Sequence, residues 1–267
     1  MKQSIREKLK SKMNKPLKIL ALYGLSLVFS ALLLLVPGPA MAVRPFVTDD
    51  ARVVGKDLFL LETSLKRDKT RLQNLNLLAY GPTDNLELTL GFSDGFLLEG
   101  DNARKASIAG PLAQAKYLFT QGTTNGYPGV ALVAGGGAPY GSSEFAAPSW
   151  SQFAYLALTE AFGDKERILI HVNVGISHAK PDDTWKYAMT WGVGTQIRLV
   201  GGLHYVGEIF HGDPYSGDTG GSFQTGFRYF VSDRIQIDAT GGSGFWGDNK
   251  PETFFGCGIR FIFDPPW

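Results

Sequence analysis

The sequence contains a single cysteine, Cys257, among its 267 residues. One thiol cannot form an internal disulfide, so covalent cross-links do not hold this fold together. This cysteine does not follow the N-terminal leader either, so the cysteine that carries lipid in lipoproteins is absent. Long apolar runs are equally scarce, because nothing after Val36 approaches the roughly 20 residues that a transmembrane helix needs. If the rest of the chain lies in a membrane, strands must cross it.

The first 42 residues have the order of a secretory signal peptide. Seven basic residues lie before or at the edge of an apolar run over 19–36, and Pro-Gly-Pro-Ala-Met-Ala follows at 37–42. The A-x-A arrangement predicts cleavage after Ala42. The leader is long, and a start at Met13 would fit better. An uncleaved membrane anchor is the alternative, since the apolar run approaches the length that spans a bilayer.

Removal of this leader leaves an acidic chain. It takes away seven of the 26 Lys and Arg and one of the 25 Asp and Glu, so the formal charge of residues 43–267 is near −5. An acidic chain argues against nucleic acid as a partner. The 33 glycines and 33 aromatic residues (18 Phe, 10 Tyr, 5 Trp), with a mean hydropathy of −0.04, do not fit helices in lipid. Glycine, aromatics and alternating polar residues are typical of transmembrane β-barrels.

Alternation of apolar and polar residues is the main pattern after the leader. It is clearest over 189–198, 168–177 and 86–93, where apolar side chains alternate with Thr, Gly, Gln, Asn, His, Glu or Arg. The sequence therefore predicts an all-β fold, a transmembrane antiparallel up-and-down β-barrel that forms one domain over 43–267. Twelve strands are expected, an even number as in single-chain bacterial barrels: 57–66, 71–80, 86–94, 111–120, 129–136, 150–162, 167–177, 187–199, 203–211, 222–230, 235–241 and 253–263.

The connections between these strands alternate in length, as expected for short periplasmic turns and longer outer loops. The short ones, rich in turn-forming residues, are 81–85, 163–166, 200–202 and 231–234. The long ones are 94–108, 138–149, 177–186, 212–221 and 242–252. A brief loop around Asp68 and a long connection over 121–128 are the exceptions. Residues 43–55 form a lead-in rather than a strand.

Two parts of the sequence resemble a known family. The run Arg44-Pro-Phe-Val-Thr-Asp-Asp-Ala51, followed by Gly55 and a strand with Glu62, resembles the start of the outer-membrane barrel family named after the MetA pathway of phenol degradation. Tyr80-Gly-Pro-Thr-Asp-Asn-Leu-Glu-Leu88 and Tyr205-Val-Gly-Glu208 are similar to that family's turn and inward-facing glutamate. The resemblance implies a transporter in the cell outer membrane, of the Gram-negative type, for small aromatic or hydrophobic compounds.

The end of the chain resembles the signal that the barrel-assembly machinery reads on a last strand. Gly258-Ile-Arg-Phe-Ile-Phe263 has the glycine and the alternating aromatics, but the chain continues to Trp267. Either Trp267 is the terminal aromatic or the signal is read four residues in. An ordinary amphipathic edge strand is the alternative. The expected partners are this machinery during biogenesis, outer-membrane lipid and a small-molecule solute.

If the polar faces of the strands point inward, they line the lumen and the solute pathway. The predicted lining is Glu62, Asn74, Asn76, Glu87, Gln114, Lys116, His171, Asn173, Gln196, Arg198, Glu208, Arg228, Asp238 and Arg260. The charges alternate in sign over the last five strands, and strands ~4.8 Å apart allow opposite charges to pair. This pattern fits a charged constriction that filters solutes, or equally a salt-bridge network that fills the interior. Twelve strands lie between a filled barrel and an open pore, so a narrow route and a plugged barrel are both allowed.

The sequence offers little for catalysis or for metal binding, so no enzyme activity, cofactor or metal is expected. The four histidines lack metal spacing, and Ser177 and His171 would lie ~20 Å apart on one strand. Seven aspartates could bind Ca²⁺, but no twelve-residue calcium loop contains them. Solvated turns are favoured for this set: Asp49, Asp50, Asp182, Asp183, Asp213, Asp218 and Asp248. The glycine-rich run 135–141 lacks the Gly-Lys-Ser/Thr ending of a phosphate loop.

Aromatic residues near the strand ends predict interfacial girdles, with stacking against an aromatic solute as the alternative. They are Trp150, Tyr155, Tyr187, Trp191, Tyr205, Tyr229 and Trp246. Cys257 is expected on the outward face with Phe255, Ile259 and Phe261, as a buried, inert thiol. The leading hypothesis for function is passive uptake of small compounds through the outer membrane. The alternative is a non-conducting barrel that is structural or binds a partner through its Asp- and Gly-rich outer loops.

Overall fold

The structure is a computed structural model that describes residues 46–101, 103–142, 145, 147, 149–180, 184–215, 219–247 and 250–265. They belong to one compact unit, Pro37–Trp267. Among them, no helix is long and apolar enough to cross a membrane. Several predictions lie outside the described residues: the signal peptide with its cleavage after Ala42, the start of the family-like run at Arg44, Asp182, Asp183, Asp218, Asp248 and Trp267.

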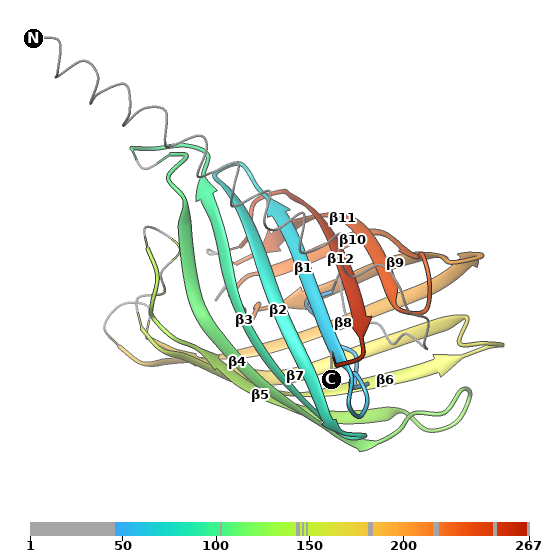
Figure 1. The fold of residues 1–267 in the computed structure, drawn as a ribbon. Coiled ribbons are helices and arrows are strands. Elements are labelled where there is room, and N and C mark those ends of the chain that lie inside the picture. The colour runs from blue at the N-terminus through green and yellow to red at the C-terminus, as the bar shows by residue number, and fades with distance from the viewer. Residues whose placement is uncertain are drawn as a thin grey trace, which may run out of the picture. The chain divides into compact units, whose positions relative to one another are not determined.

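Twelve antiparallel strands form a closed barrel, in which each strand pairs with its neighbours in the chain and β1 pairs with β12. Figure 1 shows the strands following one another around the wall. Their bounds are β1 Phe59–Arg67, β2 Arg71–Thr83, β3 Leu86–Leu97, β4 Ser107–Thr120, β5 Gly129–Gly137, β6 Ser151–Phe162, β7 Ile168–Ala179, β8 Lys186–Val200, β9 Leu203–His211, β10 Gly221–Phe230, β11 Ile235–Trp246 and β12 Phe254–Phe263. The predicted fold class and all twelve predicted strands are confirmed.

Several strands extend beyond their predicted bounds at the ends that the long connections join. β3 continues to Leu97, and β11 continues to Trp246 through a Gly- and Ser-rich stretch that carries no alternation. β4 begins at Ser107 rather than at Pro111, because a bulge places both Gly110 and Pro111 opposite Phe92. Proline cannot donate to a strand ladder, and a bulge is one of the places where a strand accepts it.

The short and long connections also alternate as predicted. Most short turns gather at one end of the barrel, here called the turn end, and most long loops gather at the other, the loop end. The exceptions are those predicted, since the short connection 68–70 lies at the loop end and the long connection 121–128 lies at the turn end. Gly163 and Lys165 in the turn between β6 and β7 have positive φ angles of 72° and 53°, which tighten that connection.

Side chains alternate between an exposed apolar outer face and a buried inner face. On β8, Met189 and Val193 are exposed, whereas Thr190 and Gln196 are buried. Cys257 lies on the outer face, as predicted, but it is exposed and not buried. Such an outer face can meet hydrocarbon while the backbone is fully paired within the barrel.

The lumen is occupied by the chain itself. Residues 46–54, here called the plug, contain no strand and run inside the barrel before the chain reaches β1, and nearly all of them are buried. Predicted only as a lead-in, this segment is an internal element of the fold. Small wall residues leave room for it: a Cβ on Gly192 would lie 2.2 Å from Thr48 Oγ1, and a Cβ on Gly81 would lie 1.9 Å from the Gly55 carbonyl oxygen.

Candidate functional site

Side chains of the wall bind the backbone of the plug. The two carboxylate oxygens of Glu208 on β9 accept the N–H groups of Val47 and Thr48, each at 2.8 Å. Asn173 on β7 accepts the N–H of Asp49 and donates to its carbonyl at 3.2 Å. Since a buried backbone group without a partner is costly, these contacts replace the strand pairing that the plug lacks.

The same pattern continues toward the turn end. The N–H of Ala51 donates to Thr159 Oγ1 on β6 at 2.9 Å, and the N–H of Val54 donates to Glu87 on β3 at 2.8 Å. These four strands, which are distant in the sequence, thus bind the backbone of the plug. Within the plug, the N–H of Arg52 donates to Asp50 Oδ1 at 2.9 Å.

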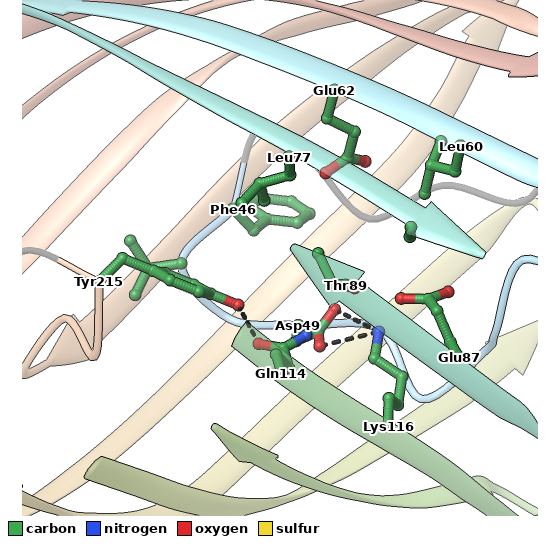
Figure 2. A pocket seen from close by; sticks show the side chains of 12 residues that line it. Phe46, Asp49, Leu60, Glu62, Leu77, Glu87, Thr89, Gln114, Lys116 and Tyr215 are labelled. Carbon is green, nitrogen blue, oxygen red and sulfur yellow. Dashed lines mark hydrogen bonds and ion pairs between the residues drawn. The ribbon is translucent and has the colours of Figure 1, made fainter. Parts of the chain in front are cut away.

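The acidic pair of the plug is buried inside the barrel. Lys116 Nζ on β4 lies 2.8 Å from Asp49 Oδ2 and donates to the Asp50 carbonyl at 3.1 Å, and the Tyr155 hydroxyl donates to Asp49 at 3.0 Å. Figure 2 shows Asp49 beside the Lys116 ammonium. The prediction that Asp49 and Asp50 are solvated turn residues was wrong, because their partners lie on strands that no local pattern connects to them.

Asp50 and Arg52 form a second ion pair within the plug, at 2.6 Å, and Arg52 also contacts Glu166 in a turn at 3.0 Å. Burial alone would raise the pKa of Asp50, but the adjacent Arg52 guanidinium holds it well below its usual range. Burial would lower the pKa of Arg52, and Asp50 and Glu166 raise it instead. Both groups therefore stay ionised in the plug.

Most of the predicted lumen residues are buried and face the interior. Ten are buried: Glu62, Glu87, Gln114, Lys116, His171, Asn173, Gln196, Glu208, Arg228 and Arg260. Arg198 and Asp238 are half-buried. Asp213, one of the predicted turn aspartates, accepts the Tyr215 N–H at 2.9 Å.

Asn74 and Asn76 do not face the lumen, so that prediction was wrong. Leu75 and Leu77, which alternate with them on β2, point inward and pack with the cluster that contains Ala51 and Val53 of the plug. The plug presents apolar side chains to this part of the wall. The inner face is therefore apolar here, and the polar residues lie outside.

Tyr155 was predicted for the outer girdle, but it is buried and points inward. Its hydroxyl lies 3.5 Å from that of Tyr215, which belongs to the connection between β9 and β10 and donates to Gln114 at 2.8 Å. An outer connection thus reaches into the lumen and contacts the same network as the plug. Of the other predicted girdle residues, five are exposed and Tyr205 is half-exposed.

The alternating charges of the last five strands pair only in part. Arg228 on β10 stands opposite Asp238 on β11, and Arg260 Nε lies 3.5 Å from Glu62 Oε1. The Glu208 carboxylate, however, accepts hydrogen bonds from the plug backbone and from Gln224, and it does not pair with an arginine of the wall. The plug is therefore part of the charge balance of the lumen.

The plug separates two cavities. At the loop end, a cavity of about 110 Å³ is lined by Lys66, Leu75, Phe210, Asp213, Tyr215 and Phe254, together with Phe46 of the plug. At the turn end, a cavity of about 320 Å³ is lined by Glu166, Gln196, Arg198 and His204, together with Arg52. A cavity beside the plug has a volume of about 30 Å³, enough for one or two water molecules.

One hydroxyl and one imidazole lie close together among the buried polar groups that the structure describes. Thr159 Oγ1 lies 3.0 Å from His171 Nδ1, but Thr159 also contacts Asp50 and Ala51, and the plug covers the pair. Among the described residues, no group of three or more His, Cys, Asp or Glu side chains could hold a metal ion.

A closed barrel with an apolar outer face and a polar, occupied lumen has the architecture of an outer-membrane β-barrel. Residues 111–261, more than half of the chain, match the family described as uncharacterised conserved protein UCP029691. The chain belongs to this family. The matched region runs from β4 to β12 and does not include the plug. No curated protein sequence matches the chain.

Outer-membrane channels and porins are among the solved structures to which this chain is similar. An outer-membrane channel from Pseudomonas putida F1, described as COG4313, has a TM-score of 0.57 at 13% identity and covers 83% of this chain and 100% of its own. The KdgM porin has a TM-score of 0.54 at 9% identity and covers 76% of this chain and 99% of its own. The NanC porin has a TM-score of 0.50 at 6% identity and covers 78% and 99%. At these identities the likeness concerns the fold.

Proposed function

We propose that the protein is a passive channel of the outer membrane for small solutes, closed in this conformation by its own N-terminal plug. The observation that carries the proposal is the way in which the plug is bound. Its backbone and its acidic side chains are held by hydrogen bonds and ion pairs, which water can replace, and cavities lie at both ends of it. Its apolar contacts are made by small side chains such as Ala51 and Val53. The fold shared with channels and porins supports this function and an outer-membrane location, reached through the predicted signal peptide.

Movement of the plug is the step that this function requires. With about 30 Å³ of free space beside the plug, water fits but an organic solute does not. When the plug leaves, the wall groups that bound it, such as Glu208, Asn173 and Lys116, face an aqueous route. The proposed solute pathway consists of Glu62, Glu87, Gln114, Lys116, His171, Asn173, Gln196, Arg198, Glu208, Arg228, Asp238 and Arg260.

The proposed solutes are small compounds that have an apolar or aromatic body and a polar group. The cavity at the loop end supports this class, because Phe210, Phe254 and Leu75 line it together with Lys66 and Asp213. The resemblance to the phenol-degradation family points to the same compounds. A mixed lining of this kind is typical of sites that bind small organic molecules.

Deletion of residues 46–54 tests the channel. Refolded into planar bilayers, the deletion variant is expected to conduct at a level several-fold above that of the full chain, and liposome swelling should report entry of small aromatic compounds. The control is Lys56→Ala with Asp57→Ala, two exposed residues beyond the plug, which should leave conductance unchanged. A sealed deletion variant would contradict the proposal and favour the non-conducting, structural or partner-binding barrel.

A further inference from the structure

Four polar side chains form a hydrogen-bonded cluster on the outer face of β1, β2 and β3. The hydroxyl of Thr63 lies 2.9 Å from Asn74 Oδ1 and 3.0 Å from Asn76 Oδ1. The side-chain amides of Asn74 and Asn76 donate to Asp94 Oδ1 at 3.2 and 2.8 Å. We call Thr63, Asn74, Asn76 and Asp94 the outer polar cluster.

The alternation of the strands places this cluster outside the barrel. Glu62 and Leu77 are buried on the inner face, and Leu75 and Ser93 line the cavity at the loop end of the lumen. The neighbours of these residues in the chain, which form the outer polar cluster, therefore point away from the lumen. Leucines of the same strands surround them on the outer face, including the exposed Leu65, Leu78 and Leu90.

The outer polar cluster lies at the depth of the hydrocarbon. β1 has nine residues, Phe59–Arg67, about the 9–11 that a tilted strand needs to cross a membrane. Thr63 is the fifth of them, and Asn76 stands opposite it on β2. An ionisable group at such a depth is costly, and it marks a functional site by default. Asp94 is the ionisable member of the cluster, and it stands opposite Asn74, two residues nearer the loop end than Asn76.

The hydrogen bonds of Asp94 leave one acceptor open. Its Oδ1 accepts from both asparagine amides, whereas Oδ2 has no hydrogen-bond partner among the residues that the structure describes. Hydrocarbon provides no donor, so this oxygen needs a proton or the donor group of another molecule.

An apolar cavity adjoins the cluster on the outer face. Its volume is about 560 Å³, within the roughly 300–1,000 Å³ of small-molecule sites. The bulge of β4 at Pro111 lines one side of it, Leu78, Leu90 and Phe92 line another, and Asn76 is part of its wall. Ile108, which also lines the cavity, stands opposite Asp94 in the strand register. The open acceptor thus lies at the edge of an apolar hollow.

We propose that this hollow binds, from within the membrane, a small apolar molecule that carries a hydroxyl group. The apolar body lies against Leu78, Leu90 and Phe92, and the hydroxyl donates to Asp94 Oδ2. A hydrocarbon chain alone would leave this oxygen without a donor. The inference rests on the proposed outer-membrane location and does not depend on whether the lumen conducts.

Paired probes with and without the hydroxyl test the proposal. Isothermal titration of the full chain in detergent is expected to show tighter binding of 1-naphthol than of naphthalene. Asp94→Asn, which removes the open acceptor and keeps the size, should weaken 1-naphthol binding at least about tenfold and leave naphthalene unchanged. Leu90→Trp, which fills the hollow, should abolish binding of both probes.

The control is Thr225→Val, which removes another outward hydroxyl, bound to Tyr205 on a distant part of the wall. It should bind both probes as the parent does. The shift of the folded band on unheated gels shows that each variant is folded. Equal binding of the two probes, or 1-naphthol binding that Asp94→Asn leaves intact, would overturn the proposal. A parent dimer that Asp94→Asn converts to a monomer, measured by light scattering, would also overturn it and assign the cluster to contact between two copies.

Discussion

Replacing Lys116 with methionine is expected to release the plug. The Lys116 ammonium lies 2.9 and 2.8 Å from the two carboxylate oxygens of Asp49 and also donates to the Asp50 carbonyl. Both side chains of the ion pair are almost fully buried, at 1% and 4% exposed. Methionine has a similar size but no charge, so the variant leaves the Asp49 carboxylate buried with Tyr155 as its remaining side-chain donor.

The size of the effect follows from the cost of an unpaired buried charge. Removing one partner of a buried ion pair costs about 3–5 kcal/mol. At about 1.4 kcal/mol for each factor of ten, the ratio of bound to released plug should fall by a factor of roughly 10² to 4 × 10³. Replacing both residues, with Lys116→Met and Asp49→Leu, removes both charges and should restore most of this loss. The difference in plug release between the single and the double variant measures the cost of leaving the Asp49 charge buried without its partner.

Thiol labelling provides the assay. The variant Val53→Cys is made in a chain that also carries Cys257→Ala. Its thiol is buried while the plug is bound, because Val53 is 6% exposed. Its reaction with a charged maleimide should be slow in the parent and at least tenfold faster with Lys116→Met. Lys66→Met is the control, since the Lys66 ammonium lies over the Phe254 ring of the wall, 4.3 Å from its centroid, and takes no part in the Asp49 ion pair. An unchanged rate in the single variant, or an equally fast rate in the double variant, would refute the reasoning.

Three further predictions concern the same segment. Gly192→Val should release the plug in this assay, because the new Cβ would lie 2.2 Å from Thr48 Oγ1. Glu208→Gln should raise the labelling rate roughly tenfold, since one carboxylate oxygen that accepts a plug N–H is lost, at about 1–3 kcal/mol. The low pKa of Asp50 means that its contribution is present above the usual aspartate pKa of 3.8 and is lost only as the pH falls through the lower folded value. The difference in bilayer conductance between the parent and Asp50→Asn should therefore stay constant from pH 7 to about pH 4, and a difference that disappears by pH 5 would contradict it.

The strands could be predicted because their side chains face lipid and lumen alternately and therefore alternate between apolar and polar. Where this contrast is strong, as from Met189 to Arg198, the sequence shows both the strand and its faces. Toward the loop end the contrast weakens, and residues 242–246 of β11 continue the ladder with glycine, serine and adjacent aromatics. Hydrogen bonds between the backbones extend the strand there, and these bonds do not require side chains that alternate between apolar and polar.

The residues that face the lumen could be predicted only on strands whose inward side chains are the polar ones. That rule holds for Glu62 and Lys116, which find buried partners in the lumen. It fails for Asn74 and Asn76, because Ala51 and Val53 of the plug make the facing inner wall apolar. Two polar residues on the outer face need partners of their own there, and they find Thr63 and Asp94.

The plug itself could not be predicted from local pattern, because its contacts join residues far apart in the chain. Val47 and its acceptor Glu208 are separated by 161 residues, and Lys116 and Asp49 by 67. A short acidic segment such as Asp49-Asp50 satisfies every local criterion of a solvated turn. The one available signal lies on the wall, where Glu208 has no arginine opposite it but faces Gly194 and Gln224. A buried carboxylate with no cation opposite it on either adjacent strand requires donors from elsewhere, and in a closed barrel those donors must come from inside the lumen.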